Sequence, residues 1–174
     1  MDYSNLVKNI VLPKGEPAPT KLTSADFYAK PLTRADLEAD LEGVNSSIET
    51  IQNTRGGSWP TEMLERDFDL LDLAWHEREF RDGNSFAYVI YSNDEKYLGC
   101  FYLYGIGYRT PLNEETIDYE VDASWWVTTD ACKSGYYEKV YEALQNWLTN
   151  DFCFSKIVYS NKVIPSEPQL PRPK

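Results

Sequence analysis

A short Ser-Gly loop in the second half of the chain is the strongest candidate for chemistry. In the segment 122–148, DASWWVTTDACKSGYYEKVYEALQNWL, an aromatic strand runs through Ser134 and Gly135 directly into an amphipathic helix. Helix N-termini present unpaired backbone N–H groups and a partial positive charge, so such a junction can hold a phosphate or another anion without a basic side chain. An ordinary turn at Gly135 is the alternative interpretation.

Strands are predicted on both sides of this loop. Runs rich in β-branched and aromatic residues, bounded by turn residues, favour strands, and they occupy residues 27–32, 86–92, 97–106, 117–127 and 155–161. The polar stretch 93–96 joins two of them as an antiparallel hairpin. The last strand follows the helix after the Ser-Gly loop, so strand, helix and strand form one βαβ crossover. The patterns predict an α/β fold with a mixed, mostly antiparallel sheet and flanking helices.

Three helices are predicted from apolar residues at helical spacing. Thr33 is expected to cap the first, and the loop 53–60 separates it from the second, which covers 61–80. The third follows Gly135. The residues expected to face inward are Leu37, Leu41 and Val44 on the first helix, Leu64, Phe68, Leu71 and Trp75 on the second, and Tyr137, Val140, Tyr141, Leu144 and Leu148 on the third.

Proline-rich segments mark the ends of the predicted domain. Three prolines before residue 20 predict an extended arm over 1–25, and a proline-rich stretch predicts an irregular tail over 166–174. Residues 26–165 form a single domain in this interpretation. A length of 174 residues is sufficient for one ordinary domain and too short for two.

The charge of the chain limits its partners. A formal net charge of -11 opposes a nucleic-acid or anionic-membrane partner, because phosphate binding needs a basic surface. Acidity suits an amine or cationic substrate instead, although a surplus of carboxylates that merely keeps the protein soluble is the preferred explanation of the charge.

Cysteine and histidine usage points away from several other chemistries. Cys100, Cys132 and Cys153 are odd in number and widely spaced, so neither a disulfide framework nor a metal site is predicted and a reducing, cytoplasmic setting is favoured. No apolar run resembles an export signal or approaches membrane-spanning length. His76, the only histidine, lies in a charged helical stretch and is interpreted as a helix-surface residue.

The order of elements over residues 27–165 resembles the GNAT superfamily of N-acetyltransferases. KPLTRADLEADLEGV (30–44) is similar to that family's first strand and helix, FAYVIYSNDEKYLGCFYLY (86–104) to its second and third strands, and the segment 122–148 to its acetyl-CoA segment. There the family has Arg or Gln, two residues, Gly, one residue, then Gly or Ala. Cys132, Gly135 and Tyr137 stand at these positions, so only the glycine matches.

The resemblance implies acetyl-CoA as the cosubstrate. In such proteins the pantetheine arm pairs with the strand before the loop, and the pyrophosphate lies against the loop amides. The residues implied around the cosubstrate are Trp126, Val127, Cys132, Lys133, Ser134, Gly135, Tyr136, Tyr137 and Asn161. Tyr137 would either block the site or turn outward, since a small residue there lets the helix approach the cofactor.

Acetyl transfer to an amine also needs a base, an oxyanion donor and an acid for the leaving thiolate. Asp122 and Glu120 are the candidate bases, because i, i+2 spacing puts them on one face of the long strand; carboxylates that face solvent are the alternative. Tyr136 or Tyr141 is the candidate acid. Cys132 beside a helix N-terminus is expected to have a lowered pKa, but without a nearby histidine a covalent mechanism is disfavoured.

Two functions therefore compete. The first is an acyl-CoA-dependent N-acetyltransferase that acts on a small amine by direct attack, and the second is a non-catalytic GNAT-like binding or interaction module that has lost its cofactor site. A hydrolase based on the carboxylates near residue 115 has no geometric support. The family's last helix and hairpin, which often complete the acceptor pocket, have no counterpart in this sequence. We therefore expect that the N-terminal arm or a second subunit of a homodimer covers the sheet edge, or that the acceptor site is open. Four tryptophans are expected either to line an acceptor pocket or to pack in the core: Trp59, Trp75, Trp125 and Trp126.

Overall fold

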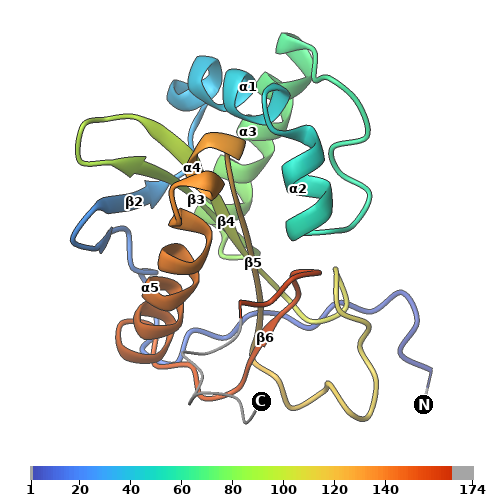
Figure 1. Cartoon of the computed structure of the whole chain (residues 1–174). Coiled ribbons are helices and arrows are strands. Elements are labelled where there is room, and N and C mark those ends of the chain that lie inside the picture. Colours follow the sequence, from blue (N-terminus) through green and yellow to red (C-terminus); the bar gives the residue numbers. More distant parts are fainter. Residues whose placement is uncertain (1, 166–174) are drawn as a thin grey trace, which may run out of the picture.

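A single mixed sheet forms the centre of the computed structural model, which describes residues 2–165 (Figure 1). Its six strands follow one another in chain order across the sheet. They are β1 (Leu22–Thr23), β2 (Phe27–Pro31), β3 (Phe86–Ser92), β4 (Tyr97–Tyr104), β5 (Val121–Val127) and β6 (Ile157–Tyr159). Neighbouring strands are antiparallel except β5 and β6, which are parallel. The predicted mixed, mostly antiparallel sheet is confirmed.

Helices cover both faces of this sheet (Figure 1). They are η1 (Arg34–Asp36), α1 (Leu37–Asn45), α2 (Ile48–Thr54), α3 (Arg66–Asp82), α4 (Thr129–Lys133) and α5 (Tyr136–Asn150). Helix α5 lies on one face, and α1, α2 and α3 lie on the other. Thr33 caps the first turn as predicted, in a capping box with Asp36. No helix in residues 2–165 combines the length and apolarity that a membrane crossing requires.

Alternate residues of the central strands feed two separate cores. Trp125 packs with α5 in one core, whereas Trp126 packs in the other core with residues of α1, α2 and α3. Successive side chains of a strand point to opposite faces, so a sheet covered on both sides buries every position. All eight residues of β4 are accordingly buried.

Two helical predictions were wrong. Residues 48–54 form a separate helix, α2, although a single helix was expected between Thr33 and the loop that was predicted to begin at 53. In α3 the expected stripe is also rotated: Phe68 and Leu71 are exposed, and Asp69, Leu73 and His76 are buried. The second error arose because the apolar pattern ignores polar residues, and two of the three buried positions on this helix are polar.

The N-terminal residues lie along the domain rather than apart from it. Ile10 and Ala18 are buried in the core on the α5 side. The Lys8 ammonium group donates to the carbonyls of Ile117 and Tyr119, just before β5. The predicted tail over 166–174 lies outside the described residues.

Candidate functional site

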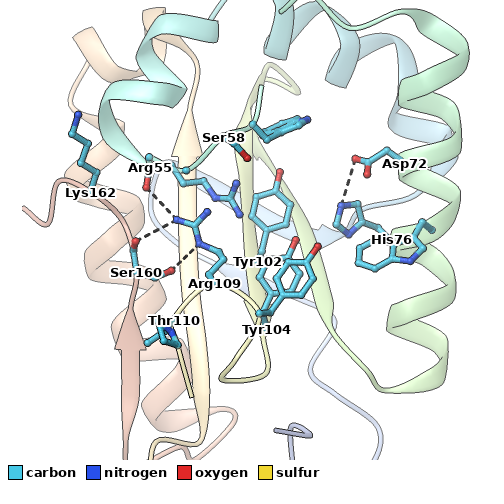
Figure 2. Close-up of a pocket in the computed structure, with 16 residues that line it drawn as sticks. Arg55, Ser58, Asp72, His76, Tyr102, Tyr104, Arg109, Thr110, Ser160 and Lys162 are labelled. Carbon is cyan, nitrogen blue, oxygen red and sulfur yellow. Dashed lines mark hydrogen bonds and ion pairs between the residues drawn. The ribbon is translucent and has the colours of Figure 1, made fainter. Parts of the chain in front are cut away.

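A cavity of about 800 Å³ opens on the face of the sheet that carries α2 and α3 (Figure 2). The end of α2 and the loop after it form one wall, and α3 forms the wall opposite. Tyrosines of β4 and of the following loop form the floor. The segment after β6 closes the remaining side, with Ser160 and Lys162 on the lining.

Arg55 and Arg109 lie side by side on one wall (Figure 2). Arg55 is buried at the end of α2; its Nε donates to Ser124 Oγ at 3.1 Å, and its guanidinium lies 4.5 Å from the centre of the Tyr102 ring. Arg109 donates to Ser160 Oγ at 3.0 Å and to the Arg55 carbonyl at 3.2 Å. Burial and the neighbouring Arg55 charge lower the pKa of Arg109. Among the ion pairs within residues 2–165, none includes either arginine.

His76 and Asp72 lie on the opposite wall, one helical turn apart on α3 (Figure 2). The His76 Nε2 lies 3.5 Å from the Asp72 Oδ2, and the imidazole packs against the Tyr102 ring with centroids 5.6 Å apart. His76 is only 6% exposed, so its interpretation as a helix-surface residue was wrong. An imidazole oriented by a carboxylate in a cavity wall is a common arrangement for a general base.

Tyr102 and Tyr104 separate these two walls (Figure 2). Burial raises the pKa of both hydroxyls above the ordinary value of a tyrosine, so both are neutral at pH 7. Tyr102 accepts a hydrogen bond from the Trp126 indole at 2.9 Å. Of the four tryptophans considered for an acceptor pocket, Trp59 and Trp75 line the cavity, and the other two are fully buried in the cores.

The two carboxylates expected to act as bases hold backbone in place instead. Asp122 is fully buried; it accepts from the Thr110 amide and hydroxyl, and from the Ser160 hydroxyl at 2.5 Å. Burial raises its pKa even though these hydrogen bonds favour the ionised form. The Glu120 Oε1 accepts from the amides of Ser155 and Lys156. Asp122 therefore supports the cavity from below, through Thr110 and Ser160, and neither carboxylate is on its lining.

Tyr136, the expected acid, lies on the other face of the sheet. Its ring packs edge-on against Phe27, and the Lys139 ammonium group lies 5.2 Å from the ring centre. Phe27 belongs to the core on the α5 side. The structure therefore does not bring Tyr136 together with the carboxylates.

The Ser-Gly loop is a tight junction between α4 and α5. The Ser134 amide donates to the carbonyls of Asp130 and Ala131, and the Gly135 amide donates to Cys132. Gly135 adopts a left-handed conformation, φ 85°, which fits the turn interpretation. Lys133 is the last residue of α4. Two amides expected to grip the pyrophosphate thus have protein acceptors in this conformation.

Cys132 does not match the expectation of an activated thiol. It lies inside α4 and packs against the core on the α5 side. Burial, reinforced by the nearby Glu138 charge, raises its pKa rather than lowering it. The expectation failed because it placed a helix N-terminus after Cys132, and α4 begins before it.

The gap expected for the pantetheine lies beyond the last β5–β6 pair, Ala123 with Tyr159. Here the Asn161 side chain takes the place of a strand: its Oδ1 accepts from the Trp125 amide at 3.0 Å, and its Nδ2 donates to the Trp125 carbonyl at 2.9 Å. The same Nδ2 donates to the Tyr137 hydroxyl at 2.7 Å. We refer to this region as the β5–β6 gap. Trp126 and Val127, the expected partners of the pantetheine, pair with Cys100 and Gly99 of β4.

Tyr137 fills the β5–β6 gap in this conformation. Its chain position is on α5, and its hydroxyl donates to the Val163 carbonyl at 2.5 Å and lies 3.3 Å from the Thr54 carbonyl of α2. A side chain that joins α5 on one face to α2 on the other must cross the level of the sheet. The side chain is 3% exposed, so it blocks the gap, one of the two outcomes that the sequence left open.

The cavity and the gap share a wall. The amides of Lys162 and Val163 donate to the carbonyls of Arg55 and Thr54, which ties the segment after β6 to the end of α2. Arg55 and Lys162 line the cavity on one side of this wall, and Tyr137 reaches Thr54 and Val163 on the other. Among residues 2–165, no three His, Cys, Asp or Glu side chains gather as metal ligands.

Solved structures of N-acetyltransferases share this fold. RimL, described as a ribosomal L7/L12 alpha-N-protein acetyltransferase in complex with coenzyme A, matches with a TM-score of 0.62 at 12% identity, over 79% of this chain and 72% of its own. A ribosomal-protein-S5-alanine acetyltransferase from Vibrio fischeri matches with a TM-score of 0.59 at 7% identity, over 80% and 72%. The spermidine N-acetyltransferase SpeG from Vibrio cholerae, in a mutant form, matches with a TM-score of 0.50 at 15% identity, over 77% and 69%.

Comparison by sequence adds nothing to this result: no family model matches the chain, and no curated protein matches it significantly. The structural matches define the class of fold. The chain has the GNAT fold, and the resemblance seen in the order of its strands and helices is confirmed at that level.

Apart from Trp59 and Trp75, sequence reasoning missed the residues that give the cavity its chemistry. Arg55, Arg109 and His76 come from three separate segments, and only the fold brings them together. One signal was present for His76, because Asp72 precedes it by four residues, the spacing at which helical side chains meet. For the arginines the sequence carried no comparable signal.

Proposed function

We propose that this chain is an acyl-CoA-dependent N-acetyltransferase that transfers an acetyl group to the amine of a small acceptor by direct attack in a ternary complex. The observation that supports this most is the position of the cavity. On a fold shared with N-acetyltransferases, it presents a paired imidazole and shares a wall with the β5–β6 gap. Acceptor and thioester would then meet across the end of α2 and the segment after β6.

In this proposal His76 is the general base. An amine attacks a thioester only after losing a proton, and the imidazole faces the cavity while Asp72 orients it. Tyr104 lines the same cavity and keeps its proton at neutral pH, so it is a suitable donor to the leaving thiolate. Asp122 positions the cavity wall and does not contact the acceptor.

Acetyl-CoA would enter by the β5–β6 gap, which requires Tyr137 to move. The closed gap favours a second candidate function, a non-catalytic module that binds a small ligand in the cavity. Asn161 bonds to the Tyr137 hydroxyl and to the Trp125 backbone, so the side chains that close the gap have their hydrogen bonds without a cosubstrate.

Calorimetric titration with acetyl-CoA tests the proposal against this alternative. We expect micromolar binding, together with acetylation of one or more members of a panel of primary amines. Product should be detected by mass spectrometry, because Cys153 is an exposed free thiol and would react with thiol reagents. If acetyl-CoA fails to bind to both the wild type and Y137F, which loosens the gap, the transferase proposal is wrong and the binding module remains.

A further inference from the structure

A buried arginine and a half-buried one, neither of which forms an ion pair within residues 2–165, make one wall of the cavity. Arg55 is 6% exposed, and within residues 2–165 no acceptor reaches its two Nη atoms; only its Nε is bonded, to Ser124. Arg109 is bonded to neutral oxygens of Ser160 and to the Arg55 carbonyl. Neighbouring like charges that are partly removed from water repel each other, and this arrangement persists in proteins mainly where a site uses it.

The opposite wall has the complementary character. Asp72 is half-buried at the cavity edge, and its one ion-pair contact within residues 2–165 is with the His76 imidazole. Figure 2 shows the arginines and this pair facing each other across Tyr102 and Tyr104. The cavity is therefore polarised, with cationic groups at one end and a carboxylate with an imidazole at the other.

We propose that the cavity binds a zwitterionic small molecule, an amine that also carries a carboxylate or phosphate group. The anionic group forms hydrogen bonds with the free guanidinium nitrogens of Arg55 and Arg109, in the forked geometry that arginine offers to oxyanions. The amine lies toward Asp72 and His76. This inference rests on the proposed function for the identity of the site, and it narrows the acceptor to one class.

The same wall disfavours a polyamine. A polycation such as spermidine, for which SpeG is named, would place its second charge against two arginines that form no ion pair within residues 2–165. The overall charge of -11 therefore misleads about the cavity, because Asp72 is the one acidic residue that the described part of the chain contributes to its lining.

Thermal shift and calorimetry with two matched series of probes test this. The first series is L-phenylalanine, phenethylamine and 3-phenylpropionate; the second is phosphoethanolamine, ethanolamine and inorganic phosphate. In at least one series we expect the zwitterion to bind at least about tenfold more tightly than either partial analogue, since each lost charge pair costs about that factor. The better series distinguishes a carboxylate from a phosphate.

Charge variants assign the effect to the wall. R55Q should remove the advantage of the zwitterion over the plain amine, and R55K, which keeps the charge but not the fork, should retain only part of it. R81Q makes the same change of charge on an exposed residue of α3 and should bind like the wild type. Circular dichroism of each variant checks that it is folded.

Several results would overturn the inference. It is wrong if in both series the zwitterion binds no better than the amine, including the case in which none binds, or if its advantage survives in R55Q. It is also wrong if R55Q weakens acetyl-CoA and leaves the zwitterion unaffected, because the arginines would then serve the cosubstrate. All these measurements omit acetyl-CoA except the last, so failure of the zwitterion leaves acetyl transfer to another amine intact, and failure of acetyl-CoA binding leaves the cavity assignment intact.

Discussion

The cavity and the β5–β6 gap are two neighbouring regions built in opposite ways. In the gap, every polar group of the Asn161 side chain has a protein partner, and Tyr137 is buried. In the cavity, Arg55 has nitrogens without a partner among residues 2–165, and Asp72 and His76 face open space. Polar groups that find hydrogen-bond partners within the protein stabilise a fold. Buried polar groups without such partners destabilise it, and they are expected where a ligand supplies the missing hydrogen bonds. The difference indicates that the cavity is ready for its ligand and that the gap must first open.

The largest effect is expected from the cavity. H76Q should lower kcat for acetyl transfer by about 10²-fold or more, because a positioned general base contributes on that scale. D72N should cost less, on the order of tenfold, since it only orients the imidazole. Steady-state kinetics over a range of pH measure both. An unchanged kcat in H76Q would mean that the base is another residue, and would remove the main chemical distinction between the two regions.

The second prediction concerns the gap. N161A leaves the Trp125 amide and carbonyl without their partners, and should lower the free energy of unfolding by about 2–4 kcal/mol. The same change should also strengthen acetyl-CoA binding, because it destabilises the closed gap and the closed gap competes with the ligand. Denaturant unfolding and calorimetry give the two numbers. Weaker acetyl-CoA binding in N161A would show that Asn161 contacts the cosubstrate instead of closing its path.

Beneath the helices of the cavity face, Asp40 and Asp69 form a buried carboxyl pair. Burial raises the pKa of both above the ordinary 3.8, and no N–H or O–H donor within residues 2–165 reaches the Asp69 oxygens. The folded state then holds protons that the unfolded state releases. Their contribution to stability is complete below the unfolded pKa and is lost as pH rises toward the folded value.

D69N imitates the protonated carboxyl and should flatten this pH dependence. At pH 8 it should be more stable than the wild type by about 1 kcal/mol or more, because the wild type loses about 1.4 kcal/mol for each pH unit between the unfolded and the folded pKa of this carboxyl and the neutral amide does not. D94N, on an exposed turn, is the control of equal charge change. Urea unfolding between pH 4 and pH 9 measures the difference. A wild-type stability that rises over this range would show instead that both carboxyl groups are ionised in the folded state and stabilised there by other groups.

Local patterns predicted the fold well, because most of its elements are set by local residues. The hairpin of β3 and β4, the strand β5 and the βαβ crossover into β6 all follow from apolar runs and turn residues. The phase of α3 could not be read in the same way. Asp69 and His76 are buried by tertiary contacts, with Asp40 and with Tyr102, that no local pattern contains.

The site was harder to predict than the fold, for a related reason. Ser134 and Gly135 looked like an anion site because glycine before a helix is compatible with both a turn and a phosphate loop. Which one forms depends on where α4 begins, and Thr128 caps it early enough to use the loop amides. The arginines of the cavity are more than fifty residues apart in the chain, and only the closure of the segment after β6 onto α2 makes them neighbours.

The smallest effect is expected from Glu120, which belongs to neither region. Its carboxylate accepts two amide hydrogens at the start of the chain segment that becomes β6. In E120Q the amide oxygen can still accept both, so the change replaces charge-assisted hydrogen bonds by neutral ones and should cost about 0.5–1 kcal/mol of stability. Steady-state kinetics should show a kcat within about twofold of the wild-type value, because a residue that only anchors the backbone takes no part in proton transfer. A large fall in kcat with unchanged stability would make Glu120 the base after all, and the chemistry would then lie outside the cavity.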